Sequence, residues 1–67
     1  MEIDVRKIKI IMARRKMSNK ALAERMGISQ QNIGVWFRKK TVLPETAGKI
    51  AEALEVDVTE ILADSNF

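Results

Sequence analysis

The chain of 67 residues contains no cysteine, no histidine and one proline. Without cysteine it has no disulfide and no thiolate chemistry, and without either residue nearly every protein zinc site is excluded. No apolar run approaches the roughly 20 residues of a membrane span, and the acidic N-terminus lacks the basic and then apolar order of a signal peptide. We therefore expect a cytoplasmic protein with no membrane association, no metal and no cofactor.

The residues that are present have the composition of a globular domain. Hydrophobic residues make up 46% of the chain and charged residues 31%, which is far from the composition of a disordered segment. A chain of this length has room for one domain and for no large catalytic core. It also lacks a nucleophile–base arrangement and a glycine-rich phosphate loop. We expect a single domain over residues 1–67 that is not an enzyme and has no small-molecule substrate.

Charge is distributed unevenly along the chain. Residues 1–40 hold eleven Lys and Arg against three Asp and Glu, a net charge of +8. Residues 41–67 hold one basic residue against six acidic ones, a net charge of −5. This asymmetry favours a surface that attracts polyanions. An ordinary solvated surface whose charges are sorted along the sequence by chance would give the same counts. The positions of these charges in the fold must therefore decide between a polyanion-binding surface and a solvated one.

Apolar residues recur at three- and four-residue spacing, which predicts a compact all-α bundle of five short helices. The expected helices cover about 4–16, 19–26, 30–38, 44–55 and 58–63. Ser18 and Ser29 stand at N-cap positions, and Gly27 stands where a left-handed residue ends the second helix. The turn between the second and third helices is so short that they must cross at a large angle, which is the geometry of a helix-turn-helix.

The same periodicity predicts burial. The side chains expected inside, for the third helix and the last segment, are Ile33, Trp36, Phe37, Val58, Ile61 and Leu62. Asp57 and Glu60 have the spacing of a capping box. A short strand at Ile3–Val5 stays open as an alternative start of the chain. Gly34 costs a helix about 1 kcal/mol relative to alanine, and close packing against the second helix is favoured as its reason over close approach of DNA.

The order and spacing of these motifs resemble the helix-turn-helix domain of the phage repressor and Cro type. Leu22-Ala23 matches a pair in the family's second helix, Gly27 its turn glycine, and Ile33 the apolar residue deep in its recognition helix. The family's closing Ile-Ala-x-Ala-Leu-x-Val pattern and the short segment after it are matched over 50–62. Each motif alone is weak, but their common order is specific.

The resemblance implies that the third helix enters the major groove of double-stranded DNA. A glutamine amide can pair with adenine through two hydrogen bonds, and a valine can contact a thymine methyl. The implied base contacts are Gln30, Gln31, Asn32 and Val35. Backbone phosphates, which give affinity and register, would be met by Asn19, Lys20, Arg38, Lys39 and Lys40.

The function implied by the resemblance is a sequence-specific transcriptional regulator, a repressor that occupies its operator as a homodimer on a roughly palindromic site. Its dimer surface would lie near residues 58–67. A homeodomain is disfavoured, because Lys39 stands where that family needs an adenine-reading Asn. A helical protein-interaction module, such as an antitoxin or a regulatory subunit, is the second alternative and would use Ile3 and Ile10 as surface residues.

The chain departs from the family's pattern at three places. An Arg–Glu ion pair that many members form between the first and third helices falls on Met12 and Phe37, so we expect an apolar contact there. The closing Asn-Gly of the third helix is replaced by basic residues over 38–40. Glu55 stands at a position that is often glycine, which predicts a strained or different end of the fourth helix.

Overall fold

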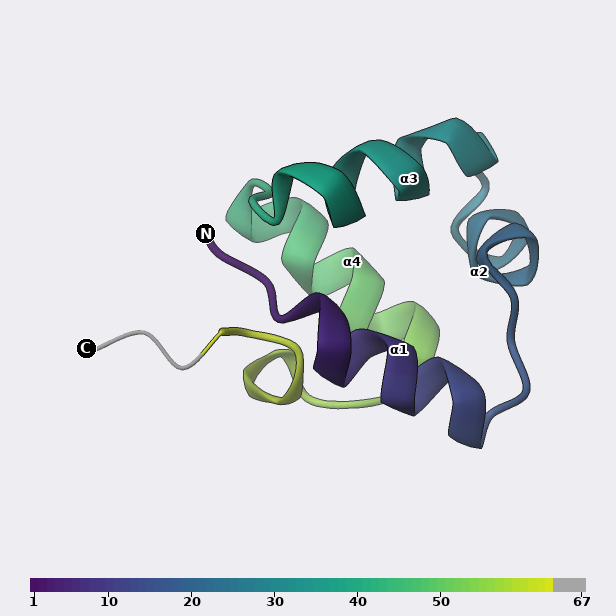
Figure 1. The fold of residues 1–67 in the computed structure, drawn as a ribbon, viewed down its shortest axis with the longest axis horizontal. Helices are drawn as coiled ribbons and strands as arrows, with labels where there is room; N and C mark the ends of the chain where they lie inside the picture. The colour runs from purple at the N-terminus through teal and green to yellow at the C-terminus, as the bar shows by residue number, and fades with distance from the viewer. Residues whose placement is uncertain (64–67) are drawn as a thin grey trace.

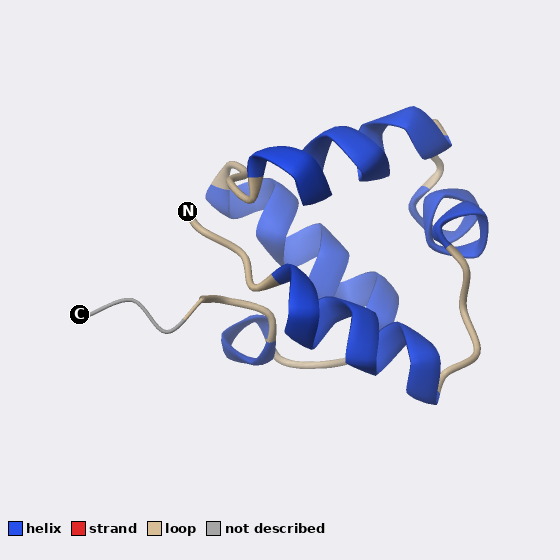
Figure 2. Ribbon diagram, in the orientation of Figure 1, coloured by secondary structure: helices blue, strands red, loops and turns tan. Residues whose placement is uncertain are grey.

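Four α-helices and one 3-10 turn form the fold in the computed structural model, which describes residues 1–63. The elements are α1 (Val5–Arg14), α2 (Asn19–Met26), α3 (Gln30–Lys39), α4 (Pro44–Leu54) and η1 (Val58–Glu60). Figure 1 shows α3 along one edge of the molecule and α2 nearly end-on beside its start, so the two helices cross at a large angle. The described residues contain helices and loops and no named strand (Figure 2).

The prediction of an all-α fold is confirmed, but the prediction of a fifth α-helix is wrong. Its place is taken by the three residues of η1. The backbone of the chain after η1 forms hydrogen bonds with the N-terminal segment and not within a helix of its own. The Asp4 N–H donates to the Ile61 carbonyl at 2.7 Å, and the Ala63 N–H donates to the Glu2 carbonyl at 3.1 Å. Because a helix needs these groups for its own hydrogen bonds, it cannot continue there.

Local side chains set where the helices begin. Asp4, Ser18 and Ser29 each accept a hydrogen bond from a backbone N–H of the following turn, at 3.1, 3.1 and 3.2 Å. Gly27 ends α2 with φ 70°, a left-handed conformation that glycine adopts without steric cost. The first helix ends two residues earlier than predicted, because the chain turns at Lys16, whose φ is 55°.

The predicted capping box at η1 is present. The Asp57 carboxylate accepts from the Thr59 N–H at 3.0 Å, and the Glu60 carboxylate accepts from the Asp57 N–H at 3.2 Å. Hydrogen bonds from the Thr59 side chain and backbone lower the pKa of the Asp57 carboxyl. A lowered folded-state pKa means that this capping contribution is present above the ordinary pKa of 3.8 and is lost as the pH falls through the folded value.

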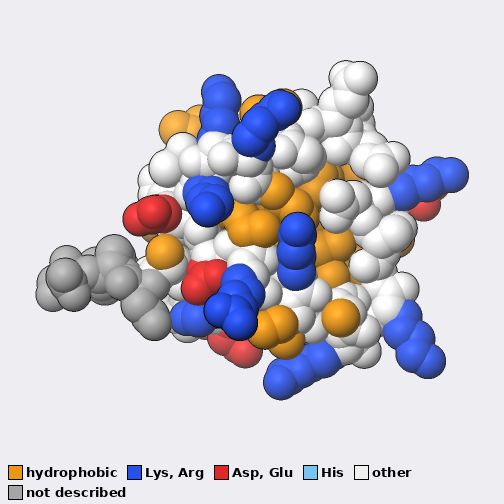
Figure 3. Space-filling view, viewed as in Figure 1, with side chains coloured by type: hydrophobic (Ala, Val, Ile, Leu, Met, Phe, Trp, Pro, Cys, Tyr) orange, Lys and Arg blue, Asp and Glu red, His pale blue; other side chains and the backbone are white. Residues whose placement is uncertain are grey.

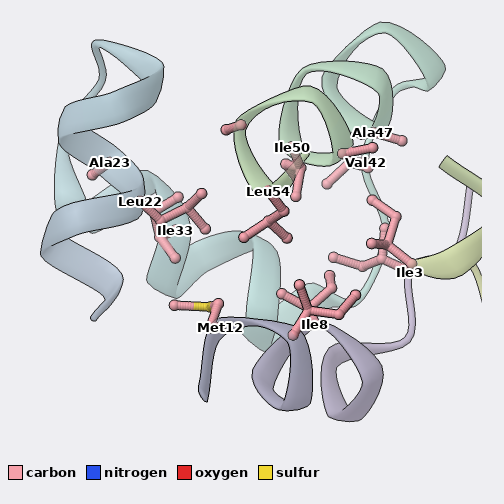
Figure 4. Packing of buried hydrophobic residues seen from close by; sticks show 14 residues of the cluster. Ile3, Ile8, Met12, Leu22, Ala23, Ile33, Val42, Ala47, Ile50 and Leu54 are labelled. Atoms are coloured by element: carbon pink, nitrogen blue, oxygen red, sulfur yellow. The ribbon is translucent and has the colours of Figure 1, made fainter. Parts of the chain in front are cut away.

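Side chains from all four helices and from both ends of the described chain meet in one apolar core (Figure 4). Its largest fully buried members are Ile3, Ile8, Leu22, Ile33, Ile50, Leu54 and Ile61. Figure 4 shows Met12 of α1 lying below Leu22 and Ile33, which come from α2 and α3. No polar or charged side chain among residues 1–63 is buried, so the core is held together by apolar contact alone.

Several burial predictions need correction. Ile3 is 2% exposed, so it cannot serve as the surface residue that the protein-interaction alternative required. Ile10, the other residue of that alternative, is 49% exposed. Four side chains expected inside are only half-buried against the core. In α3 the fully buried place is taken by Ile33, and after α4 the predicted helix with its inward stripe is replaced by the 3-10 turn η1. These side chains are Trp36, Phe37, Val58 and Leu62.

The residues at the two positions where many family members form an ion pair between the first and third helices are both apolar and both pack in or against the core. Met12 is 5% exposed, and Phe37 packs half-buried against the same core. Figure 3 shows apolar side chains gathered on the surface between α1 and α3. The direct pairing of Met12 with Phe37 stays a prediction, and their shared membership of the core supports it.

Gly34 and Gly48 lie inside α3 and α4, although nothing in the described structure requires glycine at either position. A Cβ atom built at either residue would meet no atom within 4 Å, so the predicted close packing of Gly34 against α2 is wrong. Neither residue has a positive φ. Gly34→Ala and Gly48→Ala are each expected to raise the free energy of unfolding by about 0.5–1 kcal/mol. Urea denaturation measures this, and a loss of stability at Gly34 would reveal a packing constraint.

Candidate nucleic-acid interface

One side of α3 is anchored in the core. Ile33 is 1% exposed and is the one fully buried side chain of this helix. Trp36 and Phe37, three and four residues further on, pack half-buried beside it. Three- and four-residue spacing places all three on one side of a helix. The core contact therefore fixes the rotation of α3 about its own axis and leaves the opposite side outward.

The outward side of α3 carries a stripe that starts at Gln31. Residues three, four and seven positions after it fall on the same side of the helix, and they are Gly34, Val35 and Arg38. Gln31 and Arg38 are exposed, whereas Val35 is half-buried. Seven residues are about two helical turns and about 10 Å along the axis. An amide and a guanidinium are thus presented on one side of one helix.

The first turn of α3 presents three free amide side chains. Gln30, Gln31 and Asn32 are all exposed, and none of these side chains has a hydrogen-bond partner within residues 1–63. The cap at Ser29 accepts from the Gln31 N–H at 3.2 Å and so fixes the backbone under them. Side chains that bond to nothing in the protein remain available to an external ligand.

The other end of α3 is cationic. Arg38 and Lys39 lie in its last turn, and Lys40 follows with φ 61°. All three are exposed, and the described structure gives none of them an ion-pair partner. In Figure 3, Lys and Arg side chains lie at the α3 edge, whereas the Asp and Glu side chains seen in that view lie away from it. The structure thus brings the amides and the cationic tract together on one exposed helix.

Two basic residues of the N-terminal part do not join this tract. Arg25 donates to the Ala53 carbonyl at 3.0 Å and lies 3.2 Å from a carboxylate oxygen of Glu55, and Arg15 lies 3.6 Å from the same oxygen. Glu55 has φ 58°, so α4 ends in the left-handed conformation that a glycine would adopt, and the strained end is the one of the two predicted outcomes that is found. Glu55 therefore neutralises part of the positive charge where α1, α2 and α4 end, whereas the positive charge at the end of α3 has no such partner in the described part of the chain.

Two of the predicted phosphate contacts come from α2 and not from α3. Asn19, the first residue of α2, is half-buried and Lys20 is exposed. Asn19 lines a shallow surface hollow of about 360 Å³ between α1 and α2, together with Lys9. The sequence predictions missed Lys9, since neither the helix period nor the family pattern singles it out. Its place beside Asn19 adds a cation to this part of the surface.

A family model described as helix-turn-helix matches residues 8–61. This range contains the tight α2–α3 turn and the helix that presents the free amides. The chain belongs to the helix-turn-helix family, a family of DNA-binding regulatory domains, and the resemblance to phage repressor and Cro domains is confirmed.

Two solved structures are similar to the chain over its whole length. Both are of PhpD, one described as native PhpD with cadmium atoms and the other as PhpD with cadmium complexed with hydroethylphosphonate. Each matches 100% of this chain with 30% identity and a TM-score of 0.76, but the match covers only 15% of the PhpD chain. The likeness therefore concerns one segment of a longer protein. No curated protein matches the chain.

Residues 1–63 offer neither a metal site nor a membrane span. These residues contain no cluster of three or more Asp, Glu, His or Cys side chains that could hold a metal ion. None of their helices combines the length and the apolar character needed to cross a bilayer.

Proposed function

We propose that the chain binds double-stranded DNA sequence-specifically through α3 and represses transcription by occupying its operator. The observation that carries this proposal is the exposed surface of α3, where the unpartnered amides of the first turn and the basic residues at the other end share one helix that Ile33 anchors. In a helix-turn-helix the recognition helix lies in the major groove with its first residues on base edges. The amides of this helix are in its first turn, where that geometry needs them.

Base recognition and backbone contact are assigned to different residues. Gln30, Gln31 and Asn32 would donate to and accept from base edges, and the exposed part of Val35 would contact a thymine methyl. Five residues would bind backbone phosphates, which sets register and contributes affinity without sequence preference. They are Asn19, Lys20, Arg38, Lys39 and Lys40.

We further propose that two copies act together in the cytoplasm, on a roughly palindromic operator whose half-sites lie about one helical turn of DNA apart. The dimer surface expected near residues 58–67 falls partly on 64–67, which lie outside the described residues. Within the described residues of this range, the half-buried apolar side chains are Val58, Leu62 and Ala63.

The proposal is tested by measuring the affinity for a random duplex over a range of salt concentrations. Log K should fall linearly with log salt, by about 0.9 for each phosphate neutralised. Selection from a random oligonucleotide pool should then enrich a two-fold symmetric sequence, and sedimentation should find two chains on each selected duplex. Absence of salt-dependent binding to any duplex would overturn the proposed function and favour a protein-interaction module.

Lys40→Gly separates phosphate contact from folding. Because Lys40 has φ 61°, glycine keeps the backbone conformation at lower steric cost while the amine is removed. We expect affinity for all duplexes to fall alike and the salt slope to decrease by about one. Lys49→Ala is the matched control, since Lys49 lies on α4 and is 3.5 Å from a carboxylate oxygen of Glu45. Equal slopes for the wild type and Lys40→Gly would remove Lys40 from the interface.

A further inference from the structure

Residues 1–4, here called the N-terminal strap, pair with the loop that joins α3 to α4. The Ile3 N–H donates to the Lys40 carbonyl at 3.0 Å, and the Val42 N–H donates to the Met1 carbonyl at 2.9 Å. The Met1 amino group also donates to the Val42 carbonyl at 2.9 Å. Glu2 and Thr41 face each other as an isolated antiparallel bridge. The strap therefore uses three backbone groups of a loop that follows directly on the cationic end of α3.

The strap is held from its other side as well. Its Asp4 N–H donates to the Ile61 carbonyl, and its Glu2 carbonyl accepts from the Ala63 N–H. The Ile3 side chain is 2% exposed and lies in the core. The strap is thus a fixed support and not a loose end, with the loop on one side and the segment after η1 on the other.

The loop has few means of its own to hold a conformation. Leu43 at the start of α4 forms no side-chain cap and is 71% exposed. Lys40 ends α3 in a left-handed backbone conformation, which costs a lysine more than a glycine. Apart from the Lys40 N–H bond to the Trp36 carbonyl at 2.7 Å, the strap supplies the backbone partners of residues 40 and 42.

We propose that the N-terminal strap positions the α3–α4 loop for the DNA backbone, so that Lys40 meets its phosphate without further ordering of the chain. This inference rests on the proposed function, and Ile3 is its main positioning residue. A loop that has to be ordered on binding lowers affinity, because the lost backbone freedom opposes association. A loop already paired with the strap avoids that loss, and sequence preference is left to α3.

A reversible cross-link tests the proposal directly. The hydrogen bonds that flank Glu2 and Thr41 make them a non-hydrogen-bonded pair, whose Cα atoms in such ladders lie about 4.5 Å apart, within disulfide range. Both residues are exposed, and the chain has no cysteine of its own. Glu2→Cys with Thr41→Cys therefore gives one defined disulfide, and reduction of the same protein is its matched control.

The oxidised protein is expected to bind duplex DNA at least as tightly as the reduced protein and with the same salt slope. If the strap must leave the loop before DNA can bind, oxidation will abolish binding, and this result would overturn the proposal. A wild-type chain that binds no duplex at all would instead refute the proposed function. The two failures are therefore distinct.

Loosening the strap is the second test. Ile3→Ala is expected to weaken binding on the order of tenfold for all sequences alike, since ordering a single loop residue costs about that factor. The loss should nearly vanish in a Lys40→Gly background if the strap acts through Lys40. Ile3→Val should restore affinity, and Ile50→Ala, a core substitution on α4, should leave the affinity of the folded fraction unchanged. If Ile3→Ala lowered the DNA affinity equally in the wild-type and the Lys40→Gly backgrounds, the positioning role would be refuted. If Ile3→Ala does not fold, the comparison of the oxidised and reduced disulfide variant decides the question by itself.

Discussion

Replacing Ile33 with alanine is expected to lower the free energy of unfolding by about 2–5 kcal/mol. Ile33 is 1% exposed and is the only side chain of α3 that is fully buried. Two-state domains of this length have a total stability of roughly 3–10 kcal/mol, so the loss is a large part of the whole. A ten-residue helix has no stability of its own in water. Without its anchor, α3 therefore loses its attachment to α2 and the core.

Thermal and urea denaturation followed by circular dichroism measure this loss. Each kcal/mol should shift the midpoint by about 4–8 °C for a domain of this size, so Ile33→Ala should melt at least about 8 °C below the wild type. Ile33→Val is the matched control, with an expected cost of about 0.5–1.5 kcal/mol. If alanine cost no more than valine, the core would not hold α3 at Ile33, and the outward direction of Gln31 would lose its basis.

The parts of the fold that the sequence predicts are those determined within a few residues. Ser18, Gly27 and Ser29 bound the helix-turn-helix through contacts with the next or preceding turn, so their effect is visible in the sequence itself. The period of the apolar residues likewise places Ile33 in the core. The apolar period does not predict how deeply a residue at the edge of the stripe is buried. The exposure of Trp36, for example, depends on which other helix packs over it.

The parts that the sequence does not predict join residues far apart along the chain. The pairing of Ile3 with Lys40, and that of Asp4 with Ile61, are backbone contacts that carry no side-chain signal. They replace the predicted last helix by η1 and place Ile3 inside. The ion pairs of Glu55 are not predictable from the sequence for the same reason. Arg15 and Arg25 reach its carboxylate only after three helices have packed together.

The candidate site divides in the same way. The amides on the first turn of α3 and the basic residues at its end follow from one helix and its period, so their exposure agrees with the prediction. Asn19 and its neighbour Lys9 depend on how α1 meets α2, which no local pattern encodes. The support of Lys40 by the strap depends on the tertiary fold. The contacts of all these residues with DNA stay predictions.

Gln30→Ala and Gln31→Ala are expected to have the largest effects on recognition. Each should weaken binding to the preferred duplex by about 1–3 kcal/mol, because a bidentate pair between an amide and a base is lost. About 1.4 kcal/mol is tenfold in affinity, so the double variant should approach non-specific binding. Affinity for random duplex should change little, since phosphate contacts dominate it. Titration of both duplexes at one salt concentration gives the specificity ratio for each variant.

Folding does not confound this experiment. Both side chains are exposed and bond to nothing among residues 1–63, so each alanine should leave the free energy of unfolding within about 0.5 kcal/mol. Lys40→Gly gives the opposite pattern, a lower affinity for every duplex with an unchanged ratio. Selection from a random pool with Gln30→Ala should relax the preference at one base position of each half-site. The same enriched sequence for the wild type and both alanine variants would mean that α3 does not recognise bases through its first turn.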